Sequence, residues 1–170
     1  MPIVNTTLQK AQNLIASGNL EEAKYLCEEI LKENPYQADA LHLSGLIYLN
    51  ENNYTQALEV YKKALVINSN NPSCHCNLGL AYLHTNTYDS AVKHFRKAIT
   101  LQPNMACAHR DLCQALLKVN DIKAAIASGK KAVALAPDEA TAYKNLALAY
   151  AARGNFNASF KNQIKASQLL

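Results

Sequence analysis

The feature that most constrains the fold of this chain is a repeat with a period of 34 residues. Small residues recur at this interval, at Ala23, Ala57, Ala91, Ala125 and Ser159. A larger apolar ladder runs through Leu20, Tyr54, Tyr88, Ile122 and Phe156, and a third through Ile30, Ala64, Ala98, Ala132 and Ala166. Self-similarity at a fixed interval of this length is typical of chains that stack one supersecondary unit many times.

Each repeat is predicted to form two helices joined by a tight turn. In the third repeat, Leu78, Gly79 and Tyr82 lie on one side of a helix, and a second stripe with the helical period includes Ala91 and Phe95. The turns fall at the two residue types that best tolerate a left-handed backbone: Gly18, Asn52, Asn86, Asn120 and Gly154. The pattern predicts first helices over about 5–17, 38–51, 72–85, 106–119 and 140–153, and second helices over about 20–33, 54–67, 88–101, 122–135 and 156–169.

This pattern resembles the tetratricopeptide-repeat family, whose signature is an aromatic residue, Leu-Gly, an aromatic residue, a small Ala, a Phe and a closing Pro at this period. The best match is the third repeat, with Leu78-Gly79, Tyr82, Ala91, Phe95 and Pro103. The opening aromatic residue survives only in the fifth repeat, at Tyr143. The resemblance implies an all-α, right-handed solenoid, here a single array over residues 4–170 with repeats at about 4–37, 38–71, 72–105, 106–139 and 140–170.

Composition agrees with a folded helical chain. Of the 170 residues, 49% are hydrophobic and 18% are charged, which is enough apolar material to bury a core. No apolar run is long enough to cross a membrane, and the first residues lack the apolar core of a signal peptide. Five cysteines, an odd number, fit a reducing compartment, so we expect a cytoplasmic protein that has no membrane contact.

Charge is divided unevenly along the chain. Residues 4–71 hold five Lys and eight Asp or Glu, a net charge of −3, whereas residues 72–170 carry +7. The simplest interpretation is that the charged residues on solvent-exposed helix faces vary along the chain without a functional cause. The alternative is that the second half attracts an acidic partner, or that chains associate head to tail.

Helical phase predicts where a ligand would bind. With the Leu-Gly-Tyr positions turned into the array, family resemblance places the rest of each first helix on a concave groove that takes a peptide or protein segment. Its predicted lining is His42, Leu46, Leu49, Cys76, Leu80, Leu83, Arg110, Gln114, Leu117, Lys144 and Leu148, with Leu8, Gln12 and Ile15 in the first repeat. An acidic group of the ligand would lie near Arg110 and Lys144. The competing interpretation is that Leu49, Leu83 and Leu117 belong mainly to the packing between repeats.

Other chemistry finds little support in the sequence. Some family members clamp a terminal carboxylate with Lys, Asn and Arg, but in the best frame only Asn77 matches and Asp111 would repel that ligand. Cys74 and Cys76 are two residues apart on a helix and point away from each other, which argues against a metal site. No phosphate loop or nucleophile motif appears, and the excess charge is small for a nucleic-acid partner.

We therefore expect a non-enzymatic interaction scaffold with no cofactor. One alternative is the recruiting or regulatory arm of a larger enzyme, such as a glycosyltransferase or a sulfotransferase. Another is self-assembly into a homo-oligomer through the last helix, where Phe160, Ile164, Leu169 and Leu170 lie near one face that no later repeat covers.

Overall fold

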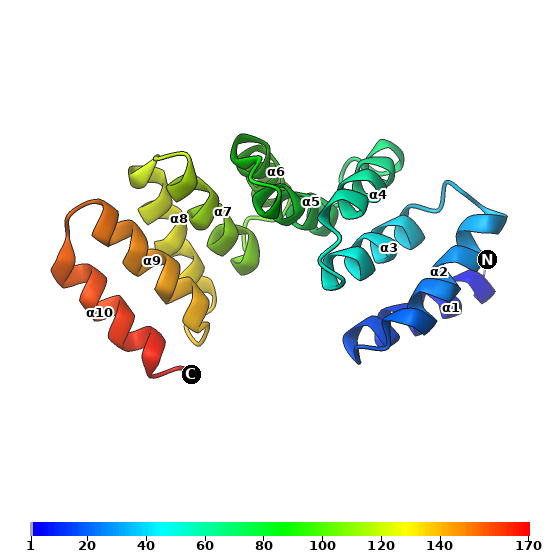
Figure 1. The fold of residues 1–170 in the computed structure, drawn as a ribbon, viewed down its shortest axis with the longest axis horizontal. Helices are drawn as coiled ribbons and strands as arrows, with labels where there is room; N and C mark the ends of the chain where they lie inside the picture. The colour runs from blue at the N-terminus through cyan, green and yellow to red at the C-terminus, as the bar shows by residue number, and fades with distance from the viewer. Residues whose placement is uncertain (1) are drawn as a thin grey trace. The chain divides into compact units, whose positions relative to one another are not determined.

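A computed structural model describes residues 2–170, and all regular secondary structure within them is helical (Figure 1). The ten helices are α1 (Pro2–Ala16), α2 (Leu20–Glu33), α3 (Ala38–Asn50), α4 (Tyr54–Ile67), α5 (Pro72–His84), α6 (Tyr88–Leu101), α7 (Ala106–Lys118), α8 (Ile122–Leu135), α9 (Ala140–Ala152) and α10 (Phe156–Ser167). The all-α prediction is confirmed. Helices α2, α4, α6 and α8 have the predicted bounds, α1 begins three residues earlier than expected, and α10 ends at Ser167.

The chain divides into two compact units. Unit 1 spans Met1–Thr85 and contains α1 to α5, and unit 2 spans Asn86–Leu170 and contains α6 to α10. The boundary falls between the two helices of the predicted third repeat. A single array over residues 4–170 stays a prediction.

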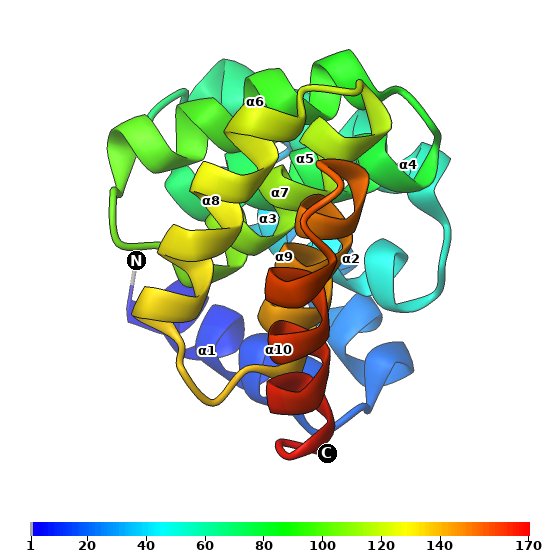
Figure 2. The same ribbon diagram turned by 90° about the vertical axis from the view of Figure 1, so that its left-hand side faces the viewer.

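Within each unit, helices that follow one another along the chain pack together, and the first helices of successive repeats also contact each other. In unit 1, α1 pairs with α2 and α3 with α4, while α1 also contacts α3, and α3 contacts α5. In unit 2, α7 pairs with α8 and α9 with α10, while α9 also contacts α7 and α8. Figure 2 looks onto α10, the last helix of unit 2. The first helices α1, α3 and α5 thus share one face of unit 1, and α7 and α9 share one face of unit 2.

The turns inside the helix pairs have the backbone that the sequence predicts. Asn52, Asn86 and Asn120 have φ of 58°, 58° and 61°, and the two glycines at the equivalent positions have φ of 81° and 79°. Asparagine tolerates this left-handed region better than most residues that carry a side chain. Two of these asparagines also accept a hydrogen bond from the hydroxyl of the following tyrosine, at 2.7 Å from Tyr54 and 2.6 Å from Tyr88.

The prolines mark the junctions between repeats. Three of them, Pro35, Pro103 and Pro137, each lie two residues beyond the end of a second helix. Pro72, which replaces the missing proline of the second repeat, instead lies in the first turn of α5, where the lack of an N–H costs nothing. Asn71 caps that helix by accepting a hydrogen bond from the backbone N–H of Cys74 at 2.9 Å.

A close contact in unit 1 explains Gly45, which occupies the glycine position of the repeat signature in the second repeat. The ring of Tyr61, on α4, is fully buried and lies directly over the backbone of Gly45 on α3. A β-carbon added at Gly45 would stand 2.4 Å from Cε1 of Tyr61. The backbone of Gly45 has ordinary helical geometry, so no unusual backbone angle requires a glycine here. The glycine is needed because α3 and α4 approach each other so closely at this point.

Two histidines occupy equivalent places at the start of α5 and α7 and make equivalent hydrogen bonds. Nε2 of His75 lies 3.1 Å from the carbonyl oxygen of Ser69, and Nε2 of His109 lies 2.9 Å from that of Pro103. Each ring therefore joins a first helix to the loop before it.

Candidate peptide-binding faces

The first-helix face of unit 1 contains a cavity of about 340 Å³ between α1 and α3. Its apolar lining is Leu8, Leu43 and Leu46. Its polar lining is Asn5, Gln9, Gln12, Asp39 and His42. Two predicted groove residues, His42 and Leu46, thus meet Leu8 and Gln12, two of the three residues predicted for the first helix. The third, Ile15, is half-buried and packs against a core of the unit. The cavity combines an apolar floor with amides, one carboxylate and one imidazole, which are groups that bind a peptide side chain and its backbone.

His42 connects α3 to α5 on the same face. Its Nε2 lies 3.1 Å from Nδ2 of Asn77, one repeat later. Its ring also lies against Tyr61, with centroids 5.8 Å apart and the planes tilted by 49°. Burial lowers the pKa of His42, and the nearby charge of Asp39 only partly offsets this effect. The imidazole is therefore held neutral, with Nε2 accepting a hydrogen bond from the Asn77 amide.

The remaining predicted residues of unit 1 are less accessible. Leu46 and Leu49 are half-buried, and each packs against one of the two cores of the unit. Leu80 is half-buried as well, whereas Cys76 and Leu83 are buried. For Leu83 this favours the interpretation that it belongs to packing. Leu46 and Leu80 keep the apolar surface that a ligand could use.

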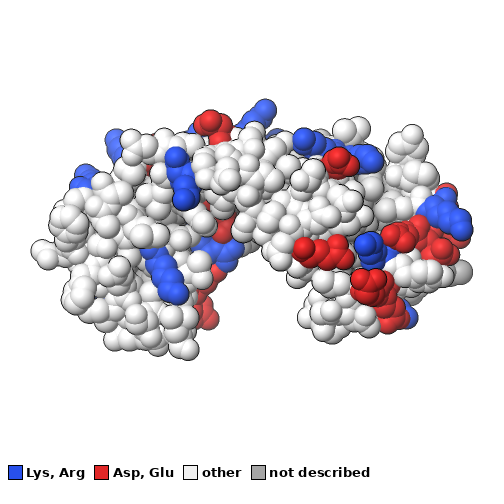
Figure 3. Space-filling model, in the orientation of Figure 1, with Lys and Arg blue, Asp and Glu red and all other residues white. Residues whose placement is uncertain are grey.

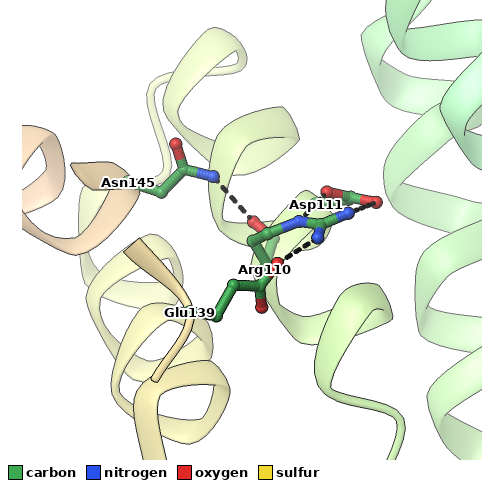
Figure 4. A network of polar contacts seen from close by, with 4 residues as sticks. All are labelled: Arg110, Asp111, Glu139 and Asn145. Atoms are coloured by element: carbon green, nitrogen blue, oxygen red, sulfur yellow. Dashed lines mark hydrogen bonds and ion pairs between the residues drawn. The ribbon is translucent and has the colours of Figure 1, made fainter. Parts of the chain in front are cut away.

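In unit 2, the predicted cation Arg110 is already neutralised by two carboxylates (Figure 4). Its Nε and Nη2 donate to Oδ1 and Oδ2 of Asp111 at 2.6 and 3.0 Å, and its Nη1 donates to Oε1 of Glu139. Asn145, on α9, donates from Nδ2 to the carbonyl oxygen of Arg110 at 3.2 Å. The cluster links α7 to α9 and to the residue that precedes α9, so it is part of the packing between the repeats of unit 2.

The electrostatics of this cluster limit what Arg110 can do. Burial alone would lower the pKa of the guanidinium, but the hydrogen bonds and charges of Asp111 and Glu139 raise it above its usual value. Only 24% of the Arg110 side chain is exposed, and its charge is matched within the cluster. A ligand carboxylate near this face would therefore meet Lys144, which is exposed, before it meets Arg110.

The other predicted residues of unit 2 lie beside this cluster on α7 and α9. Gln114 and Leu148 are exposed, and Leu117 is half-buried. Leu148 is the largest apolar side chain on this face that the repeat packing leaves in solvent. Together with Lys144 it forms a small apolar and basic face on α9.

Four of the cysteines are buried thiols, and the described residues hold no cluster of metal ligands. Burial raises the pKa of the Cys27 thiol to about 11 and those of Cys74 and Cys113 to about 12, so these three are protonated thiols at neutral pH. Among residues 2–170, nowhere do three or more His, Cys, Asp or Glu side chains converge so that they could hold a metal ion. Within the same residues, none of the helices has the length and apolar content that crossing a bilayer requires.

Comparison with solved structures supports the same fold. A crystal structure of MamA is similar over 94% of this chain and 93% of its own, with 23% sequence identity and a TM-score of 0.81. Residues 41 to the end of MamA from Desulfovibrio magneticus RS-1 give a TM-score of 0.84 at 20% identity, over 98% of this chain and 94% of that one. YrrB, described as a TPR protein with an unusual peptide-binding site, gives a TM-score of 0.78 at 21% identity, over 96% and 84% of the two chains.

Sequence comparison identifies the repeat family. No curated protein matches the chain. Profiles described as TPR repeat or tetratricopeptide repeat match residues 45–86, 72–105 and 110–160, which together cover about two thirds of the sequence. With ten helices at the predicted period and left-handed turns at the predicted positions, the chain belongs to the tetratricopeptide-repeat family.

Proposed function

We propose that this chain is a non-enzymatic protein-interaction scaffold and that it binds an extended peptide segment on the first-helix face of unit 1. The observation that carries this proposal is the cavity between α1 and α3, in which an apolar floor is surrounded by hydrogen-bonding side chains. The similarity to YrrB, whose description names a peptide-binding site, is consistent with such a use of the fold.

The chemistry of the cavity suggests how a peptide would be held. An apolar side chain of the ligand would rest on Leu8 and Leu46, where burial of apolar area is the main source of affinity. The amides of Gln9 and Gln12 offer both donors and acceptors to the ligand backbone. Asp39 is exposed at the rim and unit 1 carries a net charge of −3, so the ligand residue nearest Asp39 would be basic or neutral.

The face on unit 2 would serve a different group. Because Arg110 is matched by Asp111 and Glu139, the acidic ligand group expected there would pair with Lys144 and contact Leu148. That pair is exposed, and an exposed ion pair contributes at most about 1 kcal/mol. Unit 2 would therefore add selectivity more than affinity.

Asn77 of α5 and Asn145 of α9 are committed to internal bonds. Asn77 bonds to His42 and Asn145 bonds to the backbone of Arg110, each across one repeat. They hold neighbouring first helices in register. A ligand that used these amides would have to displace an existing hydrogen bond, so we assign them to positioning the groove.

The test uses peptides selected from a displayed random library on the folded chain, with affinities then measured by calorimetry. We expect Leu46→Glu, on the apolar floor of the cavity, combined with Leu80→Glu, on the next first helix, to weaken binding at least tenfold, since a carboxylate at Leu46 must be desolvated when the peptide binds. Gln12→Lys, at an exposed position that lines the same cavity, provides a second variant that leaves the core unchanged. Val66→Glu is the matched control, because Val66 is an exposed apolar residue on α4 of the same unit and lies outside the cavity. Equal affinity of the wild type, the Leu46→Glu, Leu80→Glu variant and the Gln12→Lys variant would overturn the proposal.

A further inference from the structure

The exposed side of α10 is more apolar than a solvated helix face needs to be. Phe156, Phe160 and Ile164 follow one another at intervals of four residues and are 72%, 65% and 44% exposed. Side chains at this spacing form a stripe along one side of a helix. Exposed single apolar residues are ordinary, but two phenylalanines and an isoleucine in one row mark an interaction surface.

The residues equivalent to Phe160 in earlier repeats are buried. The residue 34 before Phe160 is Ile126 on α8, and the one before that is Val92 on α6; they are 5% and 7% exposed. In unit 2, the helix that follows and packs on α8 is α9. The place of Phe160 is thus one that a helix covers elsewhere in this chain.

The charge around this stripe has one sign. Residues 140–170 contain Lys144, Arg153, Lys161 and Lys165 and no Asp or Glu. Lys161 and Lys165 directly follow Phe160 and Ile164, so they lie about 100° further round the helix and border the stripe on one side. In the view of Figure 3, no carboxylate is seen over α10.

A cavity lies next to the stripe on the lysine side. It measures about 410 Å³ and is lined by Tyr143 of α9 and by Lys161, Asn162, Ile164, Lys165 and Gln168 at the C-terminal end of the chain. Tyr143 and Ile164 provide apolar walls, and the two lysines provide cations at the rim. An apolar side chain could enter here while an adjacent carboxylate met a lysine.

We propose that the outer side of α10 docks an amphipathic helix that has an apolar stripe against Phe160 and Ile164 and has Asp or Glu on the flank that faces Lys161 and Lys165. This surface differs from the cavity of unit 1, and the proposal does not depend on that one. The occupant is inferred to be a helix because Ile126, the equivalent of Phe160, is buried on α8, against which α9 packs, and it is inferred to be acidic because the last helix pair carries cations alone.

A second copy of this chain fits the surface less well. In end-to-end stacking the next helix would be α1, whose exposed side presents Gln9, Lys10 and Asn13 and so offers neither the apolar nor the acidic groups. The strongly acidic helix of the chain is α2, where Tyr25 is the one large apolar side chain exposed among five glutamates. That face supplies charge but too little apolar area to match the stripe on α10.

The experiment uses two synthetic 18-residue amphipathic helices with the same apolar stripe, one flanked by Glu and one by Lys. Each peptide carries one Trp on its apolar side; since the chain has no Trp, emission and anisotropy report the peptide alone. We expect the Glu-flanked peptide to bind wild-type protein at least tenfold more tightly than the Lys-flanked one. Phe160→Glu with Ile164→Glu should abolish this binding, and Lys161→Glu with Lys165→Glu should reverse the preference between peptides.

Controls separate this surface from the rest of the molecule. All four substituted side chains are exposed, so the variants should keep the wild-type unfolding temperature. Val66→Glu and the Leu46→Glu, Leu80→Glu variant should bind the Glu-flanked peptide as the wild type does. Equal affinity for both peptides, or binding unaffected by Phe160→Glu with Ile164→Glu, would overturn the proposal. So would concentration-dependent dimerisation of the chain alone, measured by light scattering and lost in that variant, since it would assign the face to a second copy.

Discussion

Replacing Gly45 by Ala tests the packing on which unit 1 depends. The new β-carbon would stand 2.4, 2.5 and 2.8 Å from three ring atoms of Tyr61, closer than carbon atoms approach in folded proteins. Tyr61 is fully buried between α3, α4 and α5, so its ring cannot move aside without disturbing its neighbours.

The magnitude follows from two opposing terms. Alanine is favoured over glycine in a helix interior by about 1 kcal/mol. Overpacking a tight core costs about 1–3 kcal/mol, and a contact this short belongs at the upper end. We therefore expect Gly45→Ala to lower the free energy of unfolding by about 2 kcal/mol, or the unfolding temperature by about 4–8 °C for a chain of this length.

Gly129 provides a matched control on α8. A β-carbon there would lie 3.1–3.2 Å from Cys113 and Leu146, a distance that a shift of a few tenths of an ångström relieves. Gly129→Ala should therefore stay within about 1 kcal/mol of the wild type. Thermal unfolding followed by circular dichroism at 222 nm measures both variants. Tyr61→Leu should remove most of the penalty of Gly45→Ala in a double-mutant cycle. If Gly45→Ala were as stable as Gly129→Ala, the close approach of α3 and α4 would be wrong.

Three further predictions concern titration and reactivity. Because the pKa of His42 is lowered in the folded state, the unfolded chain binds the proton more readily, and the free energy of unfolding should fall as the pH decreases below about 6.5. His42→Gln should make the urea midpoint of unfolding depend less on pH between pH 7 and pH 5. An unchanged pH dependence in this variant would exclude His42 as the cause. Asp111→Ala leaves half-buried Arg110 with Glu139 as its sole partner in the cluster, so it should cost about 1.5–3 kcal/mol in urea unfolding, whereas exposed Asp121→Ala should cost about 1 kcal/mol, the usual loss for a helix cap. A thiol reagent at pH 7.5 should modify the partly exposed Cys107 within minutes and spare the other cysteines until the chain is unfolded. Mass spectrometry of proteolytic fragments identifies the labelled residues. Labelling of Cys27, Cys74, Cys76 or Cys113 as fast as that of Cys107 would contradict their burial.

Most of the fold was predictable because the same pattern of residues recurs in five repeats, so each feature could be checked against its equivalents. A single Asn-Thr or Asn-Asn turn is ambiguous, but Asn52, Asn86 and Asn120 at one spacing identify a left-handed position, and the structure confirms it. Helix ends followed from the same phase, with errors of one to three residues at several of them. The division of the chain between α5 and α6 has no counterpart in the sequence pattern, which continues through that point.

The candidate faces were only partly predictable. Helical phase brought His42 and Leu46 to the same cavity as Leu8 and Gln12, because side chains on one face of parallel first helices must meet. Helical phase also predicted that Arg110 would be available to a ligand, because neighbouring residues such as 110 and 111 point in different directions on a helix. The long Arg side chain nevertheless folds back to Asp111 and reaches Glu139, and such contacts depend on rotamers that no period reveals.

The most direct test of the account is a map of backbone amide shifts by NMR as a library-selected peptide is added to the labelled chain. Binding to the first-helix face of unit 1 predicts the largest shifts at Leu8, Gln12, His42 and Leu46, with α2 and α4 little changed. Shifts concentrated on α2 or α4, with none along the cavity, would contradict it.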